Sequence, residues 1–201
     1  LGFNHENKYC SNSKFRIAIS KAIDSSKIIK YNYAGAAVTS DSIYYPNFLG
    51  AKKDDTFNFE PKKATKLLKE LKLKDRDEDG IIEDESGNPV TLRILVQNTN
   101  KQRLEAAETI IENLKQIGIN AELVSVDADS YKDKLESKQY DIYFGGIKID
   151  KQFNLTDLYT TYNKIGFSDS KLLTQISRLE QSLSSEEQLK QFTTIKKSIN
   201  Q

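Results

Sequence analysis

Residues 140–150 read Tyr-Asp-Ile-Tyr-Phe-Gly-Gly-Ile-Lys-Ile-Asp, and this stretch is the most informative one in the chain. Its apolar first half is typical of a buried strand, which then ends in two glycines and a carboxylate. In open α/β sheets, ligands bind in the crevice beyond the carboxyl ends of the strands. We therefore predict that Gly145 and Gly146 permit close approach to the backbone, and that Asp150 lies at a ligand-binding edge.

The same stretch closes a β-α-β-α-β pattern. Strands are predicted over 90–96, 119–126 and 140–147, with helices over 102–117 and 128–138 between them. This alternation implies parallel strands, right-handed crossovers and helices on both faces of the sheet. The fold class is therefore α/β, with an open, mainly parallel sheet flanked by helices. The residues of the 102–117 helix that we expect to face inward are Leu104, Ala107, Ile111 and Leu114.

Further helices are expected on either side of this pattern. A helix with a break covers 13–32, where Asp24 caps the second half, and Pro61 opens a helix that ends near Leu73. Residues 33–58 lack a sustained period and are expected to be irregular. A C-terminal helical part over 150–201 completes the chain, with helices predicted around 155–162, 170–183 and after the capping box at Ser184.

The composition excludes several classes of function. The chain has 30 Lys and Arg against 29 Asp and Glu in mixed order, so no nucleic-acid surface is predicted. His5 is the only histidine, which excludes His-based catalytic triads and multi-histidine metal sites. Cys10 is the only cysteine and is interpreted as a small, half-buried residue. No Gly-rich phosphate loop follows a predicted strand, and we expect no enzymatic activity.

No apolar run approaches the roughly 20 residues that span a bilayer. The chain begins at Leu1 and contains no methionine, so we expect it to be part of a longer protein. Within the chain we expect a single lobe over residues 1–201 rather than two independent domains.

An acidic loop over 75–83 matches the first half of a calcium-binding loop. Asp75, Asp77 and Asp79 alternate before Gly80, which permits the tight turn that brings carboxylates together. The twelfth position is Ser86 instead of a bidentate glutamate, although Glu83 or Glu85 could substitute. A structural calcium is therefore the only candidate cofactor, and the alternative is a solvated acidic turn between a helix and a strand.

Two interpretations of Asp150 stay open. The first is a turn or helix-capping aspartate before Leu155. The second is an acceptor for a ligand ammonium group, because a poorly hydrated carboxylate needs a partner and a peptide α-amine offers three donors with opposite charge. Pairing with Asp141 as acid and base is excluded, since the two residues lie at opposite ends of the strand.

Taken together, these features resemble the second lobe of the bacterial extracellular solute-binding proteins that serve peptide and nickel ABC transporters. The resemblance covers residues 1 to about 200. Its landmarks in order are Phe3-Asn4, Phe15 to Ile19 with Ala22-Ile23-Asp24, Gly35-Ala36, Phe59 to Ala64 with Leu67-Leu68, Asp77 to Gly80, Leu114 to Ile119, and Tyr140-Asp141 with Gly146.

The resemblance implies a type II periplasmic-binding-protein fold, in which two lobes close on a ligand and deliver it to a membrane permease. Residues 1–12 would then contain a strand near the hinge to the first lobe. A Gly-Trp-x-x-Asp run of oligopeptide-binding members maps onto 146–150, so that Asp150 would meet the peptide's α-amine. The implied ligand-binding residues are Phe144, Gly145, Gly146, Ile147, Lys148 and Asp150.

This sequence departs from the family pattern at three positions. Ile147 replaces the tryptophan that walls a side-chain pocket, and Phe144 stands where some relatives have an arginine that can meet a ligand carboxylate. Glu78 stands where many relatives have glycine, which keeps the calcium question open.

We expect a peptide-capturing lobe of a monomeric, extracellular and lipid-anchored receptor of an ABC importer. The alternative is a calcium-stabilised extracellular module that binds another protein in signalling or adhesion. The isolated lobe is expected to bind peptide only feebly, because half of the ligand's contacts would be missing.

Overall fold

The computed structural model describes residues 1–42, 45–46, 48–50, 58–146, 169–182 and 184–199. It divides into two compact units. Unit 1 consists of Leu1–Ala37 and Thr56–Gly145, and unit 2 of Val38–Asp55 and Gly146–Gln201. That the whole chain acts as a single lobe stays a prediction.

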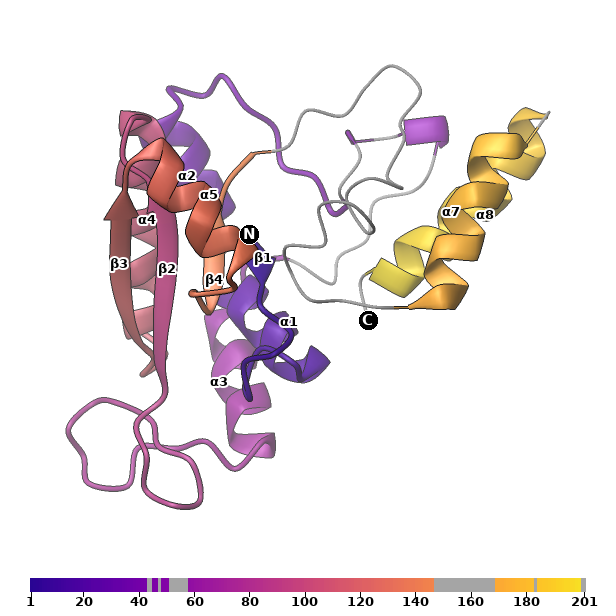
Figure 1. Ribbon diagram of the computed structural model, residues 1–201. Helices are drawn as coiled ribbons and strands as arrows, with labels where there is room; N and C mark the ends of the chain where they lie inside the picture. The colour runs from indigo at the N-terminus through magenta and orange to yellow at the C-terminus, as the bar shows by residue number, and fades with distance from the viewer. Residues whose placement is uncertain (43–44, 47, 51–57, 147–168, 183, 200–201) are drawn as a thin grey trace. The chain divides into compact units, whose positions relative to one another are not determined.

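Unit 1 is built on a four-stranded sheet in the order β1-β4-β2-β3 (Figure 1). Its central strand β2 (Thr91–Gln97) pairs in parallel with β3 (Asn120–Val126) and with β4 (Ile142–Phe144). The short β1 (Gly2–Phe3) pairs antiparallel with β4. The predicted α/β class and the parallel arrangement of the three expected strands are confirmed. The last strand is shorter than predicted, because only three of its residues join the backbone ladder.

Five helices surround this sheet. They are α1 (Ser13–Ala22), α2 (Ser25–Asn32), α3 (Pro61–Glu70), α4 (Lys101–Lys115) and α5 (Ala128–Glu136). The chain runs from β2 out to β3 and then back past β2 to β4, so right-handed crossovers place α4 and α5 on opposite faces. Figure 1 shows α4 behind the sheet and α5 in front of it. The predicted break after α1 is confirmed, because the Asp24 side chain accepts a hydrogen bond from the backbone N–H of Lys27 at 3.0 Å.

The core of unit 1 lies between the sheet and the helices α1, α3 and α4. The largest of its fully buried side chains include Phe15, Ile19, Leu68, Leu92, Ile94, Leu114, Ile119 and Ile142. In α4 the buried face is turned slightly from the predicted one. Ala106, Ile110 and Asn113 are buried with Ala107 and Leu114, whereas Leu104 and Ile111 pack at the margin of the core. Asn113 belongs to the buried face because its side-chain oxygen accepts the backbone N–H of Asp24 at 3.0 Å.

Unit 2 contains a short 3₁₀ helix η1 (Phe48–Gly50) and the helices α7 (Ser170–Gln181) and α8 (Ser185–Ile199). Both long helices were predicted, and Ser184 caps α8 by accepting the backbone N–H of Glu187 at 3.2 Å. The rings of Phe48 and Phe192 meet edge to face at 5.0 Å. The helix predicted around 155–162 lies outside the described residues.

A second feature of unit 2 is an ion pair with little exposure. Lys196 Nζ lies 2.7 Å from Asp41 Oδ2, and the two side chains are only 10% and 12% exposed. None of the helices in the described part of the chain is long and apolar enough to cross a membrane.

Candidate functional site

Gly145 directly follows β4, at the carboxyl end of the sheet in unit 1. A Cβ atom at this position would lie 2.5 Å from the hydroxyl oxygen of Tyr131 on α5 and 3.3 Å from the ring of Tyr143. The first contact is too short, so any larger residue at this position would have to displace the Tyr131 hydroxyl. The space next to Gly145 is therefore lined by a tyrosine hydroxyl, at the edge where open α/β sheets bind ligands.

Tyr131 and Tyr143 are neutral at this edge. Burial raises the pKa of Tyr131 to about 12, with Tyr143 adding to the shift and the positive charge of Arg103 opposing it. Burial also raises the pKa of Tyr143. Behind them, the ring of the fully buried Tyr140 meets that of Tyr143 edge to face at 5.6 Å. The two partly buried hydroxyls thus remain protonated near neutral pH and can donate hydrogen bonds.

Arg103 brings a positive charge to the same edge. It lies in the first turn of α4, where Asn100 caps the helix by accepting the Arg103 backbone N–H at 2.9 Å. Its guanidinium forms no ion pair with any residue in the described part of the chain, and it is close enough to Tyr131 to lower the pKa of that hydroxyl. Arg103 therefore has donors available for an anionic group.

The other predicted ligand-binding residues are placed differently or lie outside the described residues. Phe144 is half-buried and packs against the core of unit 1, as expected for alternation along a strand. Gly146 is exposed and is the first residue of the second segment of unit 2. Ile147, Lys148 and Asp150 are among the residues that the structure does not describe, so their role stays a prediction.

Asp141 lies at the other end of β4, away from the carboxyl edge at Gly145. Its carboxylate accepts hydrogen bonds from Arg93 Nε at 3.0 Å, Arg93 Nη2 at 3.1 Å, the Arg93 backbone N–H at 2.8 Å and Asn7 Nδ2 at 2.9 Å. Burial favours the neutral acid, but these bonds outweigh it and lower the pKa of Asp141. Asp141 is an ionised structural group.

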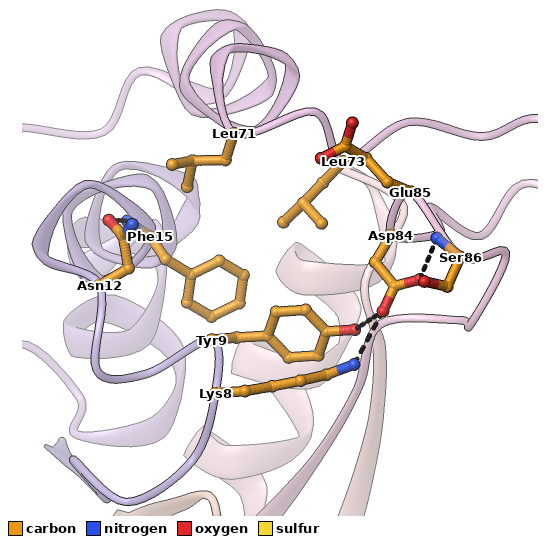
Figure 2. A pocket seen from close by; sticks show the side chains of 9 residues that line it. All are labelled: Lys8, Tyr9, Asn12, Phe15, Leu71, Leu73, Asp84, Glu85 and Ser86. Carbon is orange, nitrogen blue, oxygen red and sulfur yellow. Dashed lines mark hydrogen bonds and ion pairs between the residues drawn. The ribbon is translucent and has the colours of Figure 1, made fainter.

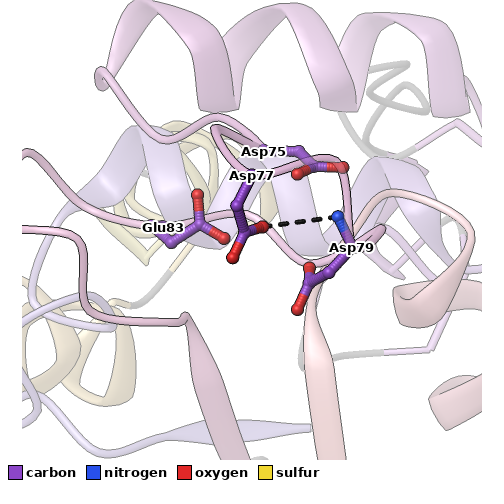
Figure 3. A group of neighbouring side chains, drawn as sticks. All are labelled: Asp75, Asp77, Asp79 and Glu83. Carbon is purple, nitrogen blue, oxygen red and sulfur yellow. Dashed lines mark hydrogen bonds between the residues drawn. The ribbon is translucent and has the colours of Figure 1, made fainter.

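The acidic loop gathers four carboxylates, as Figure 3 shows. Asp75, Asp77, Asp79 and Glu83 each offer one oxygen atom, and these atoms all lie within 4.8 Å of one another. Two glutamates were candidates for the fourth carboxylate. Glu83 lies with the three aspartates, whereas Glu85 forms an ion pair with Lys72 at 2.8 Å. The arrangement fits a hard cation that prefers oxygen ligands.

The backbone of the loop is held by the same side chains. Asp75 accepts the backbone N–H of Glu78 at 2.8 Å and of Gly80 at 3.0 Å, and Glu83 accepts that of Arg76 at 2.8 Å. Gly80 has φ of +90°, a conformation that favours glycine. Ile82 anchors the loop, because it is buried and its N–H donates to the carbonyl of Gly118 at 2.8 Å.

A separate pocket of about 340 Å³ lies near the start of α1 and the end of α3 (Figure 2). Phe15, Leu71 and Leu73 form its apolar part. Asp84 accepts hydrogen bonds from Lys8 Nζ at 2.8 Å and Tyr9 Oη at 3.3 Å on its polar side. Because residues 84–86 precede β2, this pocket is on the amino side of the sheet and is distinct from the edge at Gly145.

The open sheet with helices on both faces, and its carboxyl edge at Gly145, are as expected for a lobe of an α/β solute-binding protein. The chain belongs to the bacterial extracellular solute-binding proteins of family 5, since the sequence model for the middle region of that family matches residues 1–169.

Individual relatives agree with this assignment. The oligopeptide-binding protein AppA of Bacillus subtilis is 26% identical over 147 residues, which cover 70% of this chain and 26% of the relative. Its structure in complex with a nonapeptide superposes with a TM-score of 0.87 at 20% identity, covering 99% of this chain and 42% of that chain. The dipeptide-binding protein of Escherichia coli is 30% identical over 132 residues, or 65% of this chain and 23% of the relative.

Structural similarity extends to a protein described with a metal chelate. NikA from Brucella suis in complex with Fe(III)-EDTA has a TM-score of 0.84 at 19% identity, over 99% of this chain and 42% of that chain. These likenesses establish the fold. The chain spans about a quarter of the length of the curated relatives and about two fifths of the solved structures.

Proposed function

We propose that this chain is one lobe of a two-lobed receptor that captures peptides for an ABC importer. The observation that carries the proposal is the edge beyond β4, where the neutral hydroxyl of Tyr131 lies against Gly145. The guanidinium of Arg103, which has no ion pair among the described residues, is near enough to lower the pKa of that hydroxyl. A peptide offers carbonyl oxygens to the hydroxyl and a carboxylate to the guanidinium. The names of the relatives AppA and dipeptide-binding protein favour the same ligand class.

Two charged contacts are proposed for the ligand. Arg103 would meet a ligand carboxylate, because it is a planar cation with several donors and forms no ion pair within the described part of the chain. Asp150 would meet the α-amine, with Gly146, Ile147 and Lys148 lining the same stretch of chain. The two proposals are independent, and each is tested by its own substitution.

The chain is proposed to act by binding alone, without catalysis. Its single histidine and single cysteine are poor candidates for chemistry near neutral pH. Burial and the nearby charge of Arg16 lower the pKa of His5 to about 4, so the imidazole is neutral. Cys10 is fully buried, more so than expected from the sequence, and burial raises the pKa of its thiol to about 12. Neither group changes its charge between pH 5 and 9.

The proposed partners are the first lobe of the same receptor and a membrane permease. We place the complete receptor outside the cell, in agreement with the family's description as extracellular, and propose a lipid anchor and a monomeric state. The alternative function, a protein-binding module for signalling or adhesion, has no support among these relatives, whose names refer to peptide binding or to ABC transporters.

A structural calcium ion is proposed at Asp75, Asp77 and Asp79, with Glu83 as the fourth carboxylate. The convergence of these four oxygens and the burial of Glu83 support it. Such an ion would stabilise the loop between α3 and β2 and would take no part in ligand capture.

Calorimetric titration of the complete receptor with short peptides tests the main proposal. Wild-type receptor should bind peptide, and Arg103→Gln should weaken binding of peptides that have a free carboxylate by about tenfold or more. Lys101→Gln is the matched control, because it removes one positive charge from the same turn of α4 at a side chain that is 87% exposed. Asp150→Asn tests the amine contact in the same assay. A receptor that binds no peptide would contradict the proposed function.

A further inference from the structure

The strand that leads to the ligand edge is held by few backbone contacts. β4 has three residues, paired with β2 at Ile94↔Ile142, Leu95↔Tyr143 and Val96↔Phe144. On its other side, among the described residues, only the two residues of β1 pair with it. Strands of this length have little stability of their own, so other groups must fix the position of β4.

Asp141 supplies those groups at the amino end of β4. Its backbone N–H donates to the carbonyl of Arg93 at 3.2 Å, while its carboxylate accepts the Arg93 backbone N–H at 2.8 Å. The side chain thus takes the place of a backbone carbonyl and extends the β2–β4 ladder by one position. Two further bonds from the Arg93 guanidinium, at 3.0 and 3.1 Å, fix the carboxylate in a bidentate pair.

The N-terminal segment is tied to the same point. Asn7 Nδ2 donates to the Asp141 carboxylate at 2.9 Å, and the Asn4 backbone N–H donates to the Asp141 carbonyl at 2.9 Å. The Asn4 side chain also donates to the carbonyl of Tyr140 at 2.9 Å. We use the name polar clamp for Asn4, Asn7, Arg93 and Asp141. It joins the segment that follows β1 and the strand β2 to the amino end of β4, which lies between β1 and β2.

The clamp is connected to the ligand edge through Tyr143. A Cβ atom on Gly2 would lie 2.0 Å from the ring of Tyr143, so this ring rests on the bare backbone of β1. The other side of the ring approaches Gly145, where a Cβ would be 3.3 Å away. A shift of β1 against β4 therefore moves the ring, and with it the surroundings of Gly145 and Tyr131.

We propose that Asp141 is a positioning residue for the ligand edge, which it sets by locking β1 and β2 to β4. It does not touch the ligand, because four residues of extended chain place it about 13 Å from Gly145. The effect of Asp141 on peptide binding rests on the proposed function, whereas the effect of Asp141 on β4 can be measured without a ligand.

Asp84 provides a matched control in the same unit. Its carboxylate also accepts several bonds, including Lys8 Nζ at 2.8 Å and the backbone N–H groups of Ser86 at 2.9 Å and Asn88 at 3.0 Å. Its side chain is 19% exposed, against 10% for Asp141. It ties the N-terminal segment to the loop before β2, on the amino side of the sheet. Asp84→Asn should therefore disturb the fold without reaching Gly145.

The first measurement is hydrogen exchange on the complete receptor without ligand. Asp141→Asn should speed exchange of the backbone amides of Tyr143 and Phe144 by about tenfold or more, whereas Asp84→Asn should leave them unchanged. If Asp141→Asn does not fold, Asn7→Ala removes a single bond of the clamp and should give the same pattern with a smaller increase. Equal exchange at these amides in wild type and in both Asn7→Ala and Asp141→Asn would overturn the inference.

The second measurement is peptide binding below the melting temperature of every variant. Asp141→Asn should weaken binding about tenfold through faster dissociation, and Asp84→Asn should bind like wild type. Equal losses in both variants would indicate a general loss of stability and would refute a positioning role. If the wild-type receptor binds no peptide, the proposed function fails, while the exchange experiment still decides the role of the clamp.

Discussion

The hydroxyl of Tyr131 lies against the backbone of Gly145, so closely that a single added methyl group would be 2.5 Å from the oxygen. The two residues come from different elements, the helix α5 and the end of β4. Their contact shapes the edge of unit 1 at which we propose that a ligand binds.

Replacing Gly145 with alanine should displace the Tyr131 ring. We expect a loss of stability of about 1–3 kcal/mol from the overpacked contact and a clear loss of peptide affinity in the complete receptor. Thermal unfolding and calorimetric titration measure the two effects. Tyr131→Phe removes only the hydroxyl oxygen that the new methyl group would meet, so the double variant Gly145→Ala/Tyr131→Phe should recover part of the stability. A double variant no more stable than Gly145→Ala would contradict the steric explanation.

Local signals in the sequence were sufficient for the main elements of the fold. Asp24 was recognised as a helix cap, and its side chain does cap α2. The strands around 90–96 and 119–126 were expected from their apolar residues, and they pair in parallel along their full length. The cap and the strand positions depend on residues close together in the chain, and the parallel pairing follows from the alternation of strands and helices.

Features that depend on distant residues could not be predicted from local patterns. A strand within residues 1–12 was expected only from the family resemblance, since the pairing of Gly2–Phe3 with Ile142 and Tyr143 is a long-range contact. Tyr131 and Arg103 were not among the predicted ligand residues, because their proximity arises from the way α4 and α5 cover the sheet. Asp141 was considered only as a partner for Asp150, and its bonds to Arg93 and Asn7 required the fold to be known. One signal could have pointed to Arg103 and Tyr131. Each lies in the first turn of a helix that follows a strand, and such helices begin at the carboxyl edge of the sheet.

The ion pair between Lys196 and Asp41 should stabilise unit 2. Lys196→Met would remove this cation from beside the Asp41 carboxylate, which has little exposure, at an expected cost of about 3 kcal/mol. Lys190→Met is the control, because Lys190 lies on the same helix and is exposed. It should change stability by less than about 0.5 kcal/mol. Denaturant unfolding measures both, and equal effects of the two substitutions would refute a special role of the pair.

Acid should weaken unit 1 partly through Asp141. Its pKa in the folded protein lies below the ordinary value of 3.8, because the bonds from Arg93 and Asn7 outweigh the effect of burial. A carboxyl group with a lowered pKa stabilises the fold above its unfolded pKa, and this contribution is lost as the pH falls through the folded pKa. Wild type should therefore lose more stability than Asp141→Asn between pH 5 and the acid limit of folding. Parallel melting curves for the two proteins over that range would contradict this account.

Calcium should raise the melting temperature of the chain through the acidic loop. An ion that binds only the folded state at 100 times its dissociation constant adds about 2.7 kcal/mol of stability, which corresponds to an increase of several degrees. Asp79→Asn should reduce the increase, because it removes one of the four converging carboxylates. Glu85→Gln should not, since Glu85 pairs with Lys72 outside the group. Differential scanning calorimetry with calcium and with a chelator measures the shift. A melting temperature that is the same in both conditions would leave the loop as a solvated acidic turn, held by its own backbone bonds.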